Sequence, residues 1–218
     1  MIKNTLGIVV ISILFCLQTN AQTKQTASVE ESVWEIQTGF LGVWGYKETK
    51  LSNSIALRTE VGFDSDIFSS PYYERGRANF VMTPVITAEP RWYYNLSNRV
   101  EKGYDIDHNN GNFVSLDISF HPGILVISNV DNLEVIPDLS IVPKWGIRRT
   151  LGRHFSYEVG IGIGYQRIFY DSEKYYFFDS SDKNNGVIDL HLRIGYTFWF
   201  QISKYIISKV KFEKCQKR

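Results

Sequence analysis

Two segments in the last third of the chain alternate strictly between apolar and polar positions. In residues 155–166, aromatic or aliphatic side chains take every second place, with serine, glutamate, glycine and glutamine between them. Residues 188–198 repeat the pattern with aspartate, histidine, arginine and glycine between the apolar positions. A period of two predicts β-strands with one apolar face. Ordinary soluble strands have roughly five or six residues, whereas about 9–11 are needed for a tilted strand to cross a bilayer.

Five further segments show a weaker form of this period: 33–47, 54–64, 79–95, 113–121 and 138–149. The chain therefore has seven recognisable strands, while a closed bacterial barrel has an even number. We expect an all-β fold, an antiparallel up-and-down transmembrane β-barrel of eight strands, with one strand unassigned. Residues 23–32 make a poor strand, and the tail after Phe200 offers either an eighth strand or an interfacial helix.

The connections between these segments differ in length in a regular way. Residues 65–78, 128–137 and 171–186 are long and polar, whereas 51–53 and 150–153 are short. Because outer-membrane barrels have long external loops and short periplasmic turns, the long connections are expected outside the cell. Loops 65–78 and 171–186 are then the surfaces available to an extracellular partner. The connection 96–112 is an exception, since it is long but falls at the periplasmic end.

The N-terminal 21 residues have the pattern of a cleaved secretory signal. Lys3 precedes an apolar run over residues 6–17, and the segment ends on the small residue Ala21. We therefore expect a signal peptide over 1–21, a periplasmic N-terminal segment over 22–32, a barrel over 33–200 and a basic tail over 201–218. The charge of that tail suits anionic lipid headgroups.

Composition narrows the classes of function further. The net charge of +1 over 218 residues gives no sign of nucleic-acid binding. Removal of the signal would leave Cys215 as the single cysteine, which excludes a disulfide framework and a cysteine metal site. The four histidines share no metal-ligand spacing, so we expect neither a metal nor a cofactor.

The faces opposite the apolar ones carry acids and bases in nearly equal number. An eight-stranded barrel has an interior just wide enough for side chains, so inward charges must pair with one another. Gly160, Gly162 and Gly164 on the same face leave space for long charged side chains. We predict an interior charge network, with a proton or ion path as the alternative, formed by Arg58, Glu60, Glu89, Arg91, Asp117, Lys144, Arg148, Glu158, Asp189, His191 and Arg193.

One short motif suggests catalysis. His154 and Ser156 resemble the His-x-Ser pair of outer-membrane lipid A deacylases, with Glu158 as the acid that would complete the set. That family has asparagine directly after the serine, where this chain has Tyr157, and the motif follows a turn at the expected periplasmic end. We therefore expect no enzymatic activity and keep a lipid-modifying barrel enzyme as an alternative.

Four segments together resemble small outer-membrane β-barrel proteins of Bacteroidetes-type bacteria. They are the Asn-Ala-Gln cleavage site at 20–22 and residues 89–96, 143–146 and 192–198. The resemblance implies the fold and a cell outer-membrane location, and it supplies no catalytic residues. A barrel chain of this family commonly ends at the aromatic residue of its last strand, whereas this one continues eighteen residues past Phe200.

The combined interpretation is a monomeric outer-membrane barrel in contact with lipid, with a structural or surface-interaction role. An alternative from another class is a soluble periplasmic calycin-like barrel that binds a small apolar ligand inside. The direction of the two faces separates them, because a soluble barrel would turn its apolar residues inward and its charges outward.

Overall fold

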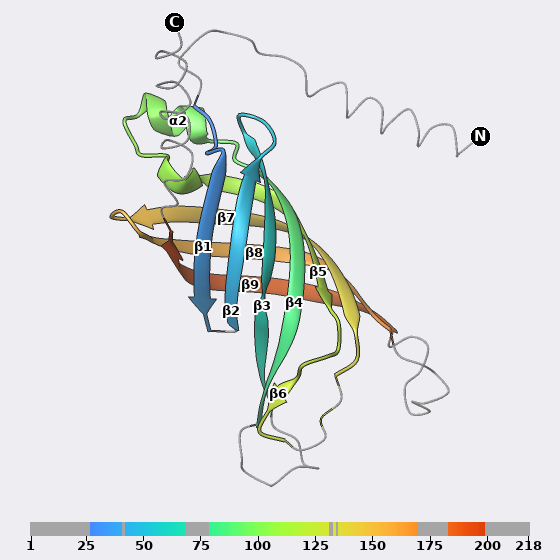
Figure 1. Cartoon of the computed structure of the whole chain (residues 1–218). Coiled ribbons are helices and arrows are strands. Elements are labelled where there is room, and N and C mark those ends of the chain that lie inside the picture. The colour runs from blue at the N-terminus through green and yellow to red at the C-terminus, as the bar shows by residue number, and fades with distance from the viewer. Residues whose placement is uncertain are drawn as a thin grey trace, which may run out of the picture.

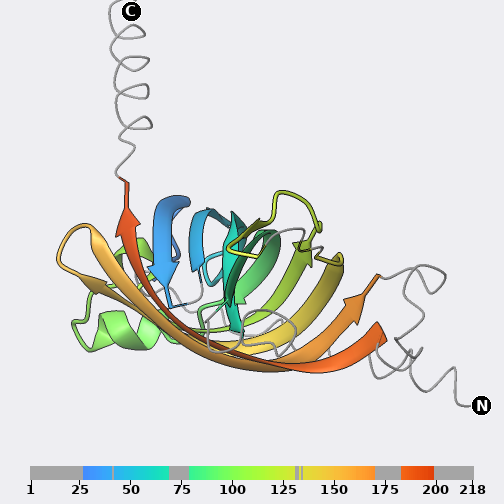
Figure 2. The same cartoon turned by 90° about the horizontal axis from the view of Figure 1, so that it is seen from below.

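Eight antiparallel strands close into a barrel in the computed structural model of the chain (Figures 1 and 2). The structure describes residues 27–40, 42–68, 79–130, 133, 135–169 and 183–198. The barrel strands are β1 Ser32–Gly39, β2 Gly42–Lys50, β3 Ile55–Phe68, β4 Asn79–Trp92, β5 Asn112–His121, β7 Asp138–Leu151, β8 Phe155–Ile168 and β9 Asn184–Thr197. A two-residue strand, β6 (Ile127–Ser128), extends the sheet beside β4.

Closure of the sheet follows from two pairings that join its ends. Strand β1 pairs with β9, and β3 pairs with β4 along its whole length, so every barrel strand has two antiparallel neighbours. Strands β7, β8 and β9 sweep round one side of the molecule and β1 to β4 round the other (Figure 2). The predicted all-β antiparallel barrel of eight strands is confirmed.

The predicted single strand over 33–47 is wrong, and its correction supplies the missing eighth strand. This segment is a hairpin in which Gly39 pairs with Gly42 and Ser32 pairs with Thr49. Gly42 has a φ of 151°, and a side chain there would lie 2.2 Å from the Phe63 carbonyl oxygen. The turn went unrecognised because its sequence is Phe-Leu, without the Asn, Asp or Gly typical of hairpin turns.

The two ends of the barrel differ in how they are connected. The helix end carries the short connections β2–β3 and β7–β8, together with residues 93–111, which hold helix α2 (Leu96–Glu101) and the 3₁₀ turn η1 (Asp107–Asn109) (Figure 1). The loop end carries the β1–β2 turn and the connections 69–78, 122–137 and 169–183. Strand β3 continues to Phe68 and β9 begins at Asn184, so strand residues occupy part of the predicted loops 65–78 and 171–186, and most of the rest of both loops lies outside the described residues. No helix in the described ranges has the length and hydrophobicity to cross a membrane.

A small apolar cluster closes the helix end. Side chains from the first described residues, from β3 and β5 and from the β4–β5 connection meet there, and all are buried: Val29, Ala56, Tyr93, Leu96 and Phe113. The backbone N–H of Glu30 donates to Asn109, and its carboxylate accepts from the backbone N–H of His108. The predicted signal peptide and residues 22–26 lie outside the described residues, as does the basic tail 201–218.

The two faces of the wall have opposite chemistry. Exposed positions around the barrel are aliphatic and aromatic, whereas the buried positions between them carry most of the charged side chains. In β4, for example, Ile86 and Trp92 are exposed while Glu89 and Arg91 are buried. The apolar face therefore points outward and the charged face points inward.

Close approach between β7 and β8 makes one glycine irreplaceable. A side chain at Gly164 would lie 2.2 Å from the Ile141 carbonyl oxygen and 2.6 Å from the Val142 Cα. Because these are backbone atoms, we expect Gly164→Ala to lower the free energy of unfolding by about 1–3 kcal/mol in urea titrations of the folded barrel. Gly45→Ala is the control, since a methyl group at Gly45 meets nothing within 4 Å. Equal stability of the two variants would contradict this account of the β7–β8 contact.

Candidate functional site

The residues of the predicted charge network all lie on strands whose inner faces meet inside the barrel. Arg58 and Glu60 come from β3, Glu89 and Arg91 from β4, Asp117 from β5, Lys144 and Arg148 from β7, Glu158 from β8, and Asp189, His191 and Arg193 from β9. Each of them makes an ion pair with another charged residue of the interior. We refer to this set, together with Glu35 and Glu48, as the interior network.

Glu35 and Glu48 were missed by reasoning from the sequence. In a single strand over 33–47 and onward, an odd and an even position point to opposite faces, so the two glutamates could not share the interior. The hairpin turn changes the alternation, and both side chains point inward and are fully buried. Alternation scored separately for the two arms of the hairpin would have found them.

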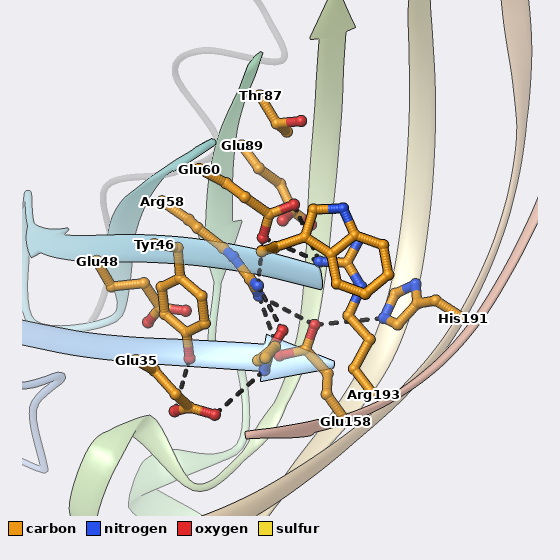
Figure 3. A network of polar contacts seen from close by, with 12 residues as sticks. Glu35, Tyr46, Glu48, Arg58, Glu60, Thr87, Glu89, Glu158, His191 and Arg193 are labelled. Carbon is orange, nitrogen blue, oxygen red and sulfur yellow. Dashed lines mark hydrogen bonds and ion pairs between the residues drawn. The ribbon is translucent and has the colours of Figure 1, made fainter. Parts of the chain in front are cut away.

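Glu158 is the centre of the network (Figure 3). Its carboxylate accepts hydrogen bonds from Arg91 at 2.7 and 2.8 Å and from Arg58 at 3.1 Å. The His191 ring lies 3.3 Å away and passes over Gly160, where a side chain would meet the imidazole. A single carboxylate on β8 therefore joins β3, β4 and β9 across the interior.

A second group of contacts lies toward the helix end. Arg148 pairs with Glu35 and, at 3.0 Å, with Glu48. Glu48 also accepts from Asn109 at 2.6 Å and from the Tyr93 hydroxyl at 3.0 Å. Tyr93 follows β4, and its burial, together with the neighbouring carboxylate, raises the pKa of its hydroxyl above the ordinary range, so the hydroxyl remains a hydrogen-bond donor.

A third group lies toward the loop end. The Lys144 ammonium is 2.8 Å from both Asp117 and Asp189. Arg193 is 2.9 Å from Glu60, and Glu60 is also 2.5 Å from Arg58. These pairs continue the network from Glu158 toward the loop end.

Aromatic rings cover the faces of three guanidinium groups. Arg58 lies 3.6 Å from the centre of the Tyr46 ring, and Arg193 lies 3.9 Å from that of Trp44. Arg91 lies 4.2 Å from the centre of the Phe113 ring. Cation–π attraction of this kind is strongest when the cation is desolvated. The buried arginines therefore have carboxylates at their edges and aromatic rings on their faces.

Long charged side chains fill the interior around Glu158, and cavities lie on both sides of them: one of about 190 Å³ at the helix end beside η1 and one at the loop end. A cavity of about 160 Å³ lies on the loop-end side of the network. It is lined by polar side chains that include Thr87, Asp117, Ser119, Lys144 and Gln166. At the rim of the loop end, the His121 ring bridges Asp64 and Asp138 at 3.0 and 3.1 Å. The paired charged side chains around Glu158 therefore form the floor of the loop-end cavity.

The three residues of the catalytic alternative have separate partners. The Ser156 hydroxyl is fully buried and donates to the Glu35 carboxylate. The His154 ring stacks on Tyr196 at 5.4 Å, and its Nδ1 lies 3.4 Å from the Thr197 carbonyl oxygen. Glu158 pairs with two arginines. These contacts leave the serine hydroxyl facing a carboxylate in the interior.

Neither the described side chains nor comparison with other proteins identifies a bound group. Within the described ranges, no set of three or more His, Cys, Asp or Glu residues is arranged to hold a metal ion. Comparison of the chain with protein-family models, curated proteins and solved structures finds no match.

Removal of the central carboxylate tests how much the barrel depends on the network. Glu158→Gln leaves Arg58 and Arg91 buried without their shared counter-charge. We expect the free energy of unfolding to fall by about 3–5 kcal/mol, measured by urea titration of tryptophan fluorescence.

The matched control removes a carboxylate from an exposed ion pair. Glu31→Gln breaks the 2.8 Å contact with Lys50, in which the glutamate side chain is mostly exposed. Exposed pairs of this kind contribute roughly 0–1 kcal/mol. A loss for Glu158→Gln as small as that of the control would mean that the network is not a major source of stability.

Proposed function

We propose that the chain is a monomeric outer-membrane β-barrel protein with a packed, charge-paired interior and a structural or surface-interaction role. The observation that carries the proposal is the direction of the faces, since apolar side chains cover the outside and the charged network fills the inside. In lipid, backbone N–H and C=O groups need hydrogen-bond partners within the protein, and the pairing of every barrel strand with two neighbours supplies them along most of the wall. The export signal expected over residues 1–21 and the resemblance to Bacteroidetes-type outer-membrane barrels fit the same location.

The distribution of aromatic side chains supports this proposal. Exposed aromatic residues gather near the helix end: Trp34, Trp92, Tyr94, Trp145, Phe155, Tyr196 and Phe198. A second group lies near the loop end: Phe40, Phe80, Phe120, Tyr165 and Phe169. Exposed aliphatic residues lie between them: Val61, Ile86, Ile118, Val159, Ile161, Ile163, Leu190 and Leu192. An apolar band with an aromatic girdle at each edge is typical of transmembrane barrels.

The soluble calycin-like alternative needs the opposite arrangement. A barrel that stores an apolar ligand inside has an apolar lining and a polar outer surface. Here the largest fully buried side chains include Arg58, Arg91 and Arg148, and the exposed outer wall is rich in isoleucine and leucine. An exposed apolar band of this extent would promote aggregation in water.

The closed floor favours a structural or surface role over transport. Buried, paired charged side chains occupy the interior between the apolar cluster and the loop-end cavity. In the proposed orientation the loop end faces outward, and its connections are the surfaces for an extracellular partner. The helix end then faces the periplasm.

A fractionation experiment tests the location and the fold together. We expect the mature protein in the outer-membrane fraction, and we expect its mobility on a denaturing gel to differ between unheated and boiled samples. Detergent-resistant barrels give such a shift because they remain folded until heated. Soluble periplasmic protein without a shift would overturn the proposal and favour the calycin-like alternative.

A charge placed on the outer wall distinguishes the two alternatives in a second way. Ile161 is exposed near the middle of β8. We expect Ile161→Lys to destabilise the inserted barrel by about 2–4 kcal/mol, because a lysine near the bilayer midplane is poorly solvated. Leu151→Lys, at the end of β7, is the control, since the effect falls to about 0–1 kcal/mol near the interface. Unfolding of both variants from vesicles would be compared, and equal stability would argue against insertion.

A further inference from the structure

The wall of the barrel is incomplete at the loop end beside the β1–β2 hairpin. Strand β1 pairs with β9 only as far as Gly39 and Arg193, although β9 begins at Asn184. On the other side, β2 pairs with β3 only as far as Gly42 and Asp64, although β3 continues to Phe68. Among the described residues, no strand covers these two edges between the hairpin tip and the loop end of the barrel. We call this gap in the wall the notch.

A cavity of about 360 Å³ occupies the notch. Its lining combines apolar residues of the outer wall with charged residues of the interior: Phe40, Leu190, Leu192, Asp64, Asp189 and Arg193. Asp64, Asp189, Arg193 and His121 also line the smaller cavity on the loop-end side of the network, so the two cavities adjoin. Together they connect the outside of the wall to the polar interior, and the volume lies in the range of small-molecule sites.

The outer lip of the notch is apolar. Phe40, at the hairpin tip, is 84% exposed, and Leu190 and Leu192, on the open edge of β9, are 66% and 63% exposed. These side chains belong to the apolar band that faces lipid in the proposed function. A hydrocarbon chain lying in that band would therefore contact the lip without leaving an apolar environment.

The inner part of the notch presents two carboxylates in fixed positions. Asp64 accepts from the Trp44 indole N–H at 2.6 Å and contacts His121, while Asp189 contacts Lys144 and His191. The side chains of Asp64 and Asp189 are 35% and 27% exposed, whereas that of Arg193 is only 12% exposed. A group entering from the lip therefore meets carboxylate oxygens before it meets a guanidinium.

The lining of the joined cavities has no excess of positive charge. Glu60, Asp64, Asp117 and Asp189 line them, together with Lys144 and Arg193. Both ring nitrogens of His121 lie against aspartates, so this ring donates from both and counts as a third cation. An anionic head group would therefore find no free cation, whereas an ammonium group would meet the oxygens of Asp64 and Asp189, which are the more exposed charged groups.

We propose that the notch binds an amphiphile with a primary ammonium head group, its N–H donors against Asp64 and Asp189 and its hydrocarbon chain along Phe40, Leu190 and Leu192. The proposal rests on the proposed function, because it requires the lip to lie at the membrane. Both a free single-chain alkylammonium and an aminolipid of the bilayer have this chemistry.

The test uses the full-length mature protein in phosphatidylcholine nanodiscs, with calorimetric titration of dodecylammonium and subtraction of empty nanodiscs. We expect saturable binding at least about tenfold tighter than that of dodecyl sulfate or dodecanol, which carry the same chain. Asp64→Asn, Asp189→Asn and Leu190→Ala should each weaken binding of dodecylammonium. Ile118→Ala, on the same apolar band but on β5, away from the notch, should leave it unchanged.

Equal binding of the three probes, or equal binding by the notch variants and Ile118→Ala, would overturn the proposal. Ser65→Trp, which fills the notch without removing a charge, replaces any aspartate variant that fails to fold. Supplementing the nanodiscs with phosphatidylethanolamine separates the sources, since competition with dodecylammonium identifies the aminolipid and its absence identifies the free amphiphile. Each sample is first tested for the heat-dependent gel shift, so a folded membrane barrel that does not bind overturns this inference alone.

Discussion

Burial of Arg58, Arg91 and Arg148 inside the barrel is the constraint on which the rest of the structure depends. A buried guanidinium without a counter-charge is strongly destabilising, and each of these three meets at least one carboxylate from a strand far away in the sequence. Arg91 meets Glu158 from β8, and Arg148 meets Glu35 and Glu48 from the hairpin. A shift of one residue in any of these strands would turn its charges toward the outside. The network therefore stabilises one register and one closed barrel against the alternatives.

This requirement also accounts for the layered interior. Near the helix end, each guanidinium has carboxylates at its edge, and those of Arg58 and Arg91 have aromatic rings on their faces, so little room for water remains. Nearer the loop end, shorter side chains such as Thr87 and Ser119 replace the long ones, and a cavity opens. The charged side chains are thus packed against one another where other long side chains surround them. Where shorter side chains surround them, they line a cavity.

Period-two alternation was sufficient to separate the apolar from the charged face of β3, β4, β5, β7, β8 and β9, because each of these strands keeps its alternation from end to end. It also identified the charged residues on those strands. It failed at the hairpin, where Phe40 and position 41 continue the apolar character of the strands through a turn. That single error removed one strand from the count and hid Glu35 and Glu48. Which acid pairs with which base could not be read from the alternation, since it depends on the order and tilt of strands around the closed wall.

The short hairpin links these features to the site proposed in the notch. Because β1 and β2 end at Gly39 and Gly42 while β9 and β3 continue, the charges of the loop end are reached from the side of the barrel as well as from its mouth. A complete wall would separate Asp64 and Asp189 from the apolar band by one layer of backbone. In the notch, carboxylates and exposed leucines line the same cavity, and such a junction of apolar surface and fixed charge matches the two parts of an amphiphile. The dense floor beneath it holds the two edges of the notch apart without requiring a strand between them.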